Sequence, residues 1–241
     1  MAPAQRGAPP GAVHPAGFWQ RAAAWSLDAL VPGLLAVAVS WPLLVPAWAR
    51  LLVVADAVLQ GLAVAMAEVL HAQLRGGASL AELPALLLPA AMDAATRLSP
   101  AIWAAAWPPL LAFAGLLVAW HAGFEATHRQ AAPGKRLLGL RVTDTKGDPP
   151  GIARALARQL AGSLSWLTLN LGHLMALAGP EHRALHDHVA GTRVLATRPG
   201  LPAWARAWLL VAVLAPLSAT GWLLARMAMR LQYLLDQAFW Y

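Results

Sequence analysis

Residues 18–45 read FWQRAAAWSLDALVPGLLAVAVSWPLLV, and this stretch decides the fold class. From residue 22 onward it is apolar apart from Asp28 and two serines, and it exceeds the about 20 residues that a helix needs to cross a bilayer. A carboxylate at membrane depth costs roughly 2.5–3.5 kcal/mol on insertion scales, so Asp28 needs a partner. Arg21 shares its helical face but lies about 10 Å away along the axis. We therefore expect Arg21 and Asp28 to find separate partners.

The composition also favours an integral membrane protein. Hydrophobic residues make up 59% of the chain and charged residues 12%, whereas soluble domains carry about 25% charged residues. The net charge of +7 is dispersed in loops between apolar runs, where positive charge orients a membrane protein. We expect the lipid bilayer, and not nucleic acid, as the partner of these basic residues. The absence of cysteine excludes disulfides and thiolate metal sites.

Four apolar stretches predict the membrane segments: 22–45, 101–122, 155–178 and 204–225. Pro108 and Pro109 should kink the second stretch, because proline removes a helical hydrogen bond. The third stretch contains Arg158 and His173, which are tolerable only where the segment packs against other helices or lines a cavity. These two residues are the best candidate partners for Asp28. The predicted fold is mainly α, an integral membrane helical bundle of three to four spans with a small cytoplasmic β element.

The domain organisation follows from these stretches. Residues 1–17 are rich in Pro, Gly and Ala and predict a disordered tail, 18–225 form the membrane domain, and 226–241 form a C-terminal tail. An insertion at about 46–100 predicts an amphipathic helix and, after Gly76-Gly77, a shorter helix over 80–98. We interpret this insertion as an interfacial or extramembrane element, with a further full span as the alternative.

Two short segments, 138–144 and 192–197, predict strands because they carry β-branched residues. If the two strands pair, they lie on one side of the membrane. The basic loops 129–154 and 180–206 both favour the cytoplasmic side. Residues 152–178 are therefore expected to form a re-entrant or interfacial hairpin that breaks near Asn170–Gly172. This topology places the N-terminus in the cytoplasm and 46–100 outside, and the last span leads outward.

Three motifs in order resemble the RDD family of membrane proteins, named for one arginine and two aspartates. They are FWQRAAAWSLDALV, AAPGKRLLGLRVTDTKGDPPGIARALARQ and HRALHDHVAGTRVLAT. The resemblance covers about residues 18–45 and 101–197. It places the family arginine on Arg21 and the first aspartate on Asp28. The second aspartate falls on Asp187, with Asp144 as a competitor.

The resemblance implies a multi-pass protein of the bacterial inner membrane, with transport as the family's proposed activity and cation/proton antiport in some members. The expected site is a polar intramembrane pathway for cations or protons. Its signature residues are Arg21, Asp28 and Asp187, its supporting residues are Arg158, His173 and His186, and its structural motif residues are Gly134, Lys135, Gly139, Gly191 and Thr192. Two alternatives stay open: a purely structural role for Asp28, and a membrane scaffold whose cytoplasmic loops bind another protein. A homo-oligomer or a membrane partner protein is compatible with either.

Enzymatic motifs are absent from the sequence. His182 and His186 share a helical face, but they lack the glutamate of a HExxH zinc motif, so we expect no metal and no cofactor. Gly134-Lys135 lacks the remainder of a phosphate-binding loop, and no GxSxG is present. We interpret Gly134 and Gly191 as turn residues with unusual backbone angles. The sequence therefore predicts a protein that is not an enzyme.

Overall fold

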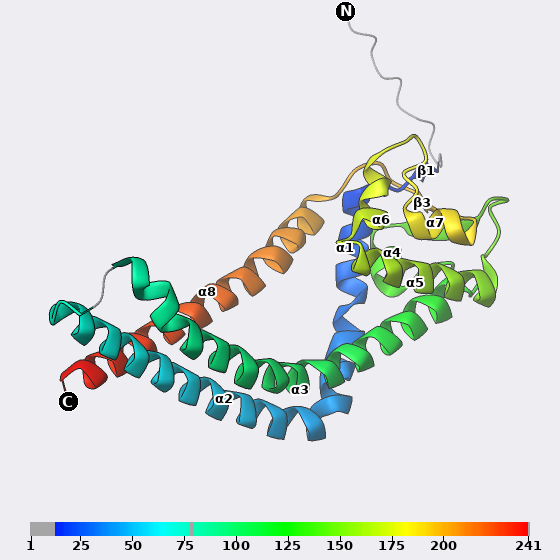
Figure 1. The fold of residues 1–241 in the computed structure, drawn as a ribbon. Helices are drawn as coiled ribbons and strands as arrows, with labels where there is room; N and C mark the ends of the chain where they lie inside the picture. The colour runs from blue at the N-terminus through cyan, green and yellow to red at the C-terminus, as the bar shows by residue number, and fades with distance from the viewer. Residues whose placement is uncertain (1–12, 78–79, 241) are drawn as a thin grey trace, which may run out of the picture. The chain divides into compact units, whose positions relative to one another are not determined.

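The computed structural model describes residues 13–77 and 80–240, which are mainly helical with one small sheet (Figure 1). In chain order the elements are β1 (His14–Pro15), α1 (Phe18–Asp28), α2 (Leu30–Leu74), η1 (Leu80–Glu82), α3 (Leu83–Glu125), α4 (Pro133–Leu137), β2 (Leu140–Asp144), α5 (Gly151–Leu167), α6 (Leu171–Leu174), η2 (Met175–Leu177), α7 (Leu185–Ala190), β3 (Thr192–Ala196) and α8 (Ala203–Trp240).

The chain divides into two compact units, and three long helices run through both. The sheet unit comprises the described residues up to Leu35 together with Phe113–Val213. The long-helix unit comprises the described residues of Ala36–Ala112 and Leu214–Tyr241. The first unit holds the sheet, the short helices and every residue of the predicted site.

The predicted insertion is not a separate pair of helices. α2 continues without interruption through Pro42 and Pro46 to Leu74, and α3 continues through Pro100, Pro108 and Pro109 to Glu125. The chain turns at Arg75–Gly77, close to the expected Gly76-Gly77 break. With 45 residues, α2 is about 68 Å long at 1.5 Å per residue, roughly twice the hydrocarbon thickness of a bilayer. The insertion therefore lengthens two membrane-type helices.

Both predicted tails contribute to regular elements where the structure describes them. Residues 1–12 lie outside the described part of the chain, but His14–Pro15 form strand β1. Residues 226–240 continue α8 as helix. Local composition missed β1 because its pairing partner lies far along the chain.

The two predicted strands are present, and they pair in one sheet. β3 lies between β1 and β2 and is antiparallel to both, with Val142 opposite Val194. Between these strands α5 ends at Leu167, and the chain reverses through Leu169 and Asn170, whose φ angles are 51° and 66°. The predicted break in this segment is therefore present. Since β2 and β3 are bonded neighbours, α5 to α7 begin and end at the same sheet.

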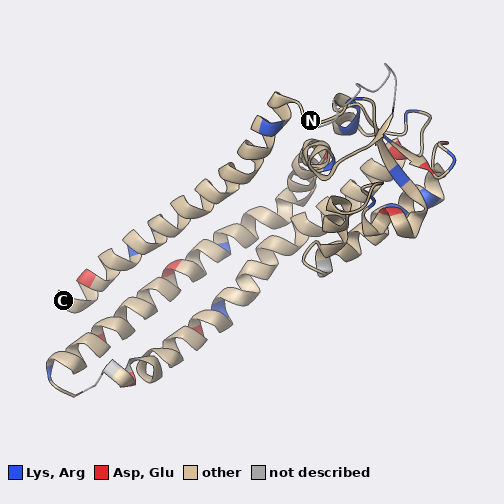
Figure 2. Cartoon of the chain, turned by 90° about the horizontal axis from the view of Figure 1, so that it is seen from above, with Lys and Arg blue, Asp and Glu red and all other residues tan. Residues whose placement is uncertain are grey.

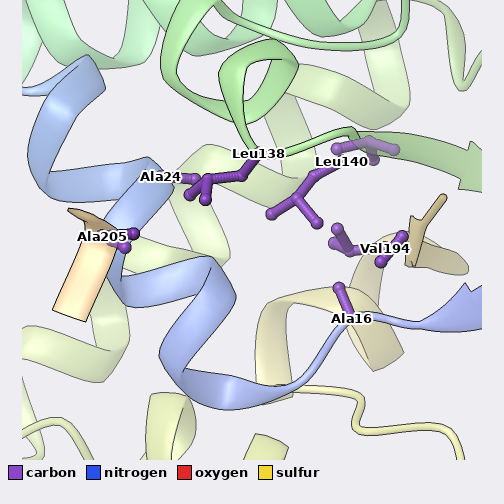
Figure 3. Close-up of a cluster of buried hydrophobic side chains, with 9 residues drawn as sticks. Ala16, Ala24, Leu138, Leu140, Val194 and Ala205 are labelled. Carbon is purple, nitrogen blue, oxygen red and sulfur yellow. The ribbon is translucent and has the colours of Figure 1, made fainter. Parts of the chain in front are cut away.

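The core of the sheet unit is built from small side chains (Figure 3). Strand residues Leu140 and Val194 pack with Leu138 against Ala24 of α1, and Ala205 brings in the start of α8. Alanine permits the backbones of helix and sheet to approach closely, which shortens the distance that polar side chains must bridge. This packing holds α1 against the sheet, and α1 also contacts α4.

Three helices in the described part of the chain are long and apolar enough to cross a membrane: the run Phe18–Leu74, Pro84–Glu125 within α3, and α8. Each contains a segment without Asp, Glu, Lys or Arg, namely 29–49, 98–124 and 207–225. Figure 2 shows charged residues only sparsely along these helices. Large side chains such as Leu34, Trp107 and Leu217 are exposed along them, as expected for lipid-facing surfaces.

Candidate functional site: a buried network of alternating charges

Asp187, at the start of α7, anchors one end of a buried charge network. Its Oδ2 atom accepts a hydrogen bond from Arg21 Nη1 at 2.6 Å, and its Oδ1 atom accepts one from Arg158 Nε at 3.0 Å. The backbone N–H of Ala184 donates to Oδ2 at 3.0 Å, so the carboxylate also caps its own helix. Two arginines and a helix start thus hold one fully buried carboxylate.

Glu125, the last residue of α3, connects Arg158 to the next cation. Arg158 Nη1 donates to both Glu125 carboxylate oxygens at 2.9 Å, and Gln159 Nε2 donates to Oε2 at 3.1 Å. Lys135 Nζ lies 3.0 Å from Glu125 Oε1 and 3.0 Å from His121 Nδ1. Glu125 therefore accepts bonds from α4 and α5 at the end of an apolar helix.

Asp28 forms the other end of the network, at the junction of α1 and α2. Its Oδ1 atom accepts a hydrogen bond from the Gly134 backbone N–H at 2.6 Å, and Oδ2 accepts one from the Lys135 N–H at 3.3 Å. Lys135 Nζ is 3.9 Å from Oδ2, so the ion pair is longer than any at Asp187. Two backbone N–H groups and one more distant ammonium therefore hold Asp28.

The network alternates in charge from end to end. Its order is Asp28, Lys135, Glu125, Arg158, Asp187 and Arg21. Three carboxylates face three cations, so the buried cluster is neutral when all six groups are ionised. Removing an ion from water costs several kcal/mol even after relaxation, and this cost is offset only when partners and hydrogen bonds are complete. The chain meets this requirement by joining α1, α3, α4, α5 and α7 in one cluster.

Burial and neighbouring charges shift the pKa values of Asp187 and His186 and so determine which of the two is charged. Burial alone would raise the pKa of Asp187, but Arg158 and Arg21 outweigh it and hold this pKa well below its usual range. Burial and Arg158 lower the pKa of His186 to about 3, so its ring is neutral near pH 7. His186 Nε2 lies 3.2 Å from Arg158 Nη2, and its ring contacts His173 at 5.1 Å. A neutral imidazole therefore lies against the most buried cation.

Position 134 requires glycine because a larger residue would not fit there, and not because of its backbone angles. Its φ is not positive, so the interpretation as a residue with unusual angles is wrong at this position. A Cβ added there would lie 2.5 Å from the Ala24 carbonyl oxygen and 3.0 Å from Asp28 Cγ. The bond from its N–H to Asp28 demands this close approach of α4 to α1. Gly191 and Gly139 do adopt positive φ angles, 62° and 66°, and Gly191 caps α7.

The structure brings the predicted site residues together, but the partner of Asp28 differs from the one predicted. Arg21 and Asp28 have separate partners, as their spacing implies. The expectation that Arg158 or His173 is the partner of Asp28 is wrong, because Asp28 faces α4 and Arg158 bonds Asp187 and Glu125. Thr192 Oγ1 lies 3.4 Å from Asp187 Oδ1. The competitor Asp144 lies apart, binding Arg154 and its own turn.

Sequence reasoning missed two members of the site, Glu125 and His121. Both lie in WHAGFE, where a charge-free run ends, and they are one helical turn apart on α3. An ionisable residue at the boundary of an apolar span is a usable signal by the same reasoning that selected Asp28. The predicted span 101–122 ends just before Glu125, so this carboxylate falls outside the stretch that the apolar pattern selects. Lys135 was interpreted as a motif residue, whereas its ammonium bridges Asp28 and Glu125.

These features define a helical, membrane-type protein with a charge-balanced site at one end of its apolar helices. The model of the RDD family matches residues 15–191, and the chain belongs to this family. It is similar to an uncharacterized protein, YxaI, of Bacillus subtilis (strain 168), with 30% identity over 88 residues. That similarity covers 36% of this chain and 58% of the length of the Bacillus protein. No solved structure matches the chain.

Proposed function

We propose that this chain is a non-enzymatic, multi-pass membrane protein that transports protons or small cations through the site formed by Asp28, Lys135 and Glu125. The observation that carries the proposal is the position of the Lys135 ammonium. It lies 3.9 Å from Asp28, 3.0 Å from Glu125 and 3.0 Å from His121, where a mobile cation would find the same acceptors. Lysine is a compact charge on a flexible stem, so an incoming cation can displace it without disrupting the helices.

The two ends of the network support different roles. Asp187 is held by two arginines, which do not release their protons, and its pKa is far below its usual range because of them. We assign it to anchoring. Asp28 has one cation at 3.9 Å and two backbone donors, so its charge is the easier one to neutralise by another ion.

The location of the site supports access from one face of the membrane. Asp28 immediately precedes the charge-free segment 29–49, and Glu125 immediately follows 98–124. The pairing of β2 with β3, and the basic residues between α3 and α8, support placing this face in the cytoplasm of a bacterial inner membrane. On this topology the N-terminus is cytoplasmic, and α2, α3 and α8 are the three spans.

The proposal is tested by flux measurements on the full chain in proteoliposomes. A pH gradient is imposed, Na⁺, K⁺ or Li⁺ is added, and wild type is compared with Asp28→Asn and with Arg136→Gln, an exposed cation next to Lys135. We expect wild type and Arg136→Gln to collapse the gradient and Asp28→Asn to lose at least ten-fold in rate. The thermal unfolding midpoint of each variant establishes that it is folded. Absence of flux in wild type with every ion rejects transport.

A second candidate is a membrane scaffold whose cytoplasmic loops bind another protein. The observation in its favour is the neutrality of the network, which is sufficient for a purely structural role in fixing the sheet unit. Under this alternative wild type gives no flux, and one partner protein is retained on purification from the native membrane. Arg129 and Lys146 are exposed on these loops and Arg154 is exposed in the first turn of α5, so triple substitution by glutamine would release that partner.

A further inference from the structure

Beyond Arg154, the exposed surface of α5 and of the segment that follows it is mainly apolar, and its exposed polar residues are Ser163, Thr168 and Asn170. No Asp, Glu, Lys or Arg occurs between residues 159 and 180. The exposed large hydrophobic residues of this hairpin are Ile152, Leu156, Leu160, Leu164, Trp166, Leu169, Leu171, Leu174, Met175 and Leu177. Leu169, at the reversal of the chain, is 87% exposed. A continuous exposed apolar surface of this kind marks a contact with a membrane or a protein.

The inner surface of α5 is polar, the reverse of a helix on a water-soluble protein. Arg158 and Ser165 are buried on the same face as Ala155 and Ala161, while residues four apart from 152 to 164 form the exposed apolar stripe. A helix that buries its charged residue and exposes its leucines is expected where lipid acyl chains surround it. Exposing leucine to acyl chains carries no hydrophobic free-energy penalty, whereas exposing it to water does. α5 thus resembles the long helices of this chain, whose exposed surfaces are likewise apolar.

Tryptophan contacts place this surface at the level where the first membrane helix begins. The Trp166 ring packs against Trp25 of α1 with centroids 5.6 Å apart. One residue further along α1, Ser26 Oγ accepts a hydrogen bond from Trp208 Nε1 of α8 at 2.9 Å. Tryptophan is enriched at membrane–water interfaces, where its ring is half in each medium. Three tryptophans from three elements meeting at one level of α1 indicate such an interface.

The topology excludes a single crossing by this segment. β2 precedes α5 and β3 follows α7 in one sheet, so the chain returns to the side from which it started. α5 has 17 residues and ends at a reversal with positive φ angles. A segment that starts and ends on one side, with apolar side chains outward and charges inward, can lie in the surface of the bilayer.

We propose that the hairpin from α5 to η2 is a membrane-binding surface that lies in the plane of the bilayer on the side of the sheet. Its exposed stripe enters the boundary between lipid headgroups and acyl chains, to the depth of about 5–10 Å that interfacial helices reach. The occupant of this surface is lipid of the membrane that the chain spans. This membrane contact does not depend on transport, because it requires no displacement of charge at Asp28.

The placement has a consequence for the charge network. Arg158 projects from the inner face of the helix whose outer face meets lipid, and it bonds both Glu125 and Asp187. Lipid packing against the stripe therefore holds the central cation of the network in position. A scaffold or a transporter would use this support equally.

The test exploits the absence of cysteine from the chain. Single cysteines are introduced in the full protein by Leu160→Cys and Leu164→Cys on the stripe, Thr145→Cys in the exposed turn after β2, and Leu214→Cys on α8. Each is labelled with a nitrobenzoxadiazole fluorophore and reconstituted in phosphatidylcholine vesicles. Quenching is measured with aqueous iodide and with lipids carrying a nitroxide at acyl carbon 5 or 12.

We expect labels at 160 and 164 to be quenched at least three-fold more by the carbon-5 nitroxide than by iodide, and more by carbon 5 than by carbon 12. Position 145 should respond to iodide, and position 214 should respond best to carbon 12. Iodide quenching at 160 and 164 equal to that at 145 overturns the proposal, since the stripe then faces water. Protection from both quenchers overturns it in favour of a covering protein, and strongest quenching by carbon 12 overturns it in favour of deep insertion.

Discussion

The two units of this protein contain ion pairs of the same chemistry in opposite surroundings. In the sheet unit, Asp187 is completely buried between Arg21 and Arg158. In the long-helix unit, Arg230 Nε donates to Asp56 at 3.0 Å, and both side chains are 42% exposed. The hydrogen-bond lengths are similar, but the first pair lies in a low-dielectric interior and the second does not. Distance alone therefore does not rank ion pairs.

The difference shows how each unit is stabilised. The sheet unit depends on specific polar contacts, because a buried carboxylate such as Asp187 balances two buried cations at once. The long-helix unit exposes large apolar side chains along most of its length. Lipid tails are as apolar as these side chains, so a side chain that loses a contact with another helix can contact lipid instead. We expect mutations in the first unit to be severe and mutations in the second to be mild.

The largest effect should come from Asp187→Asn. The amide has the size of the carboxylate but no charge, so Arg21 and Arg158 lose their common counter-ion. We expect a loss of about 3–5 kcal/mol in the free energy of unfolding, the range measured when one partner of a buried pair is removed. The measurement is denaturant unfolding of the detergent-solubilised full chain.

The matched control for that variant is Asp56→Asn in the long-helix unit. Exposed pairs contribute little, so its unfolding midpoint should stay within experimental error of wild type. Equal losses for the two variants would show that burial does not distinguish the pairs.

A smaller effect is expected from Gly134→Ala. The added Cβ would lie 2.5 Å from the Ala24 carbonyl oxygen, which belongs to the helix backbone and cannot rotate away. Overpacking of this kind costs about 1–3 kcal/mol. Gly61→Ala in α2 is the control, since nothing lies within 4 Å of its added Cβ and alanine favours helix. Its midpoint should be unchanged or raised, and a midpoint for Gly134→Ala as high as that of Gly61→Ala would mean that α4 does not approach α1 this closely.

A dependence of stability on pH is expected to be of about the same size. The pKa of His186 falls to about 3 in the folded chain because of burial and Arg158, against 6.5 for an ordinary histidine. Between these values the unfolded state binds the proton and the folded state does not, so stability is complete above about pH 6.5 and falls as the pH decreases. The expected loss from pH 7 to pH 5 is about 2 kcal/mol.

This pH dependence is measured by unfolding at several pH values for wild type and for His186→Gln. Asp187 adds nothing in this window, because its pKa lies far below it in the folded chain and near 4 in the unfolded chain. The glutamine variant should have a smaller slope than wild type, with part of the remainder coming from His173, whose pKa burial also lowers. His128→Gln, at an exposed histidine, should keep the full slope. A slope that is the same in all three proteins would assign the pH dependence elsewhere.

Much of the fold was predictable because its signals are local. Apolar runs identified α2, α3 and α8, β-branched residues identified β2 and β3, and the polar character of 155–178 indicated a segment packed against protein. The two long extensions of α2 and α3 were misjudged, because charges at Asp56 and Glu68 resemble an amphipathic surface helix. β1 was missed, since a two-residue strand exists only through its pairing with β3.

The sequence by itself determined the membrane class, the family and the identity of the ionisable residues that need partners. Burial cost is a property of each residue type in an apolar run, and it can be evaluated without coordinates. Only the tertiary structure decided which partner each residue obtains. Arg158 of α5 meets Asp187 of α7 and Glu125 of α3, and Asp28 meets the backbone of Gly134 because a residue without a side chain lets α4 approach α1. Partner choice depends on distances between segments remote in sequence, which no local pattern encodes.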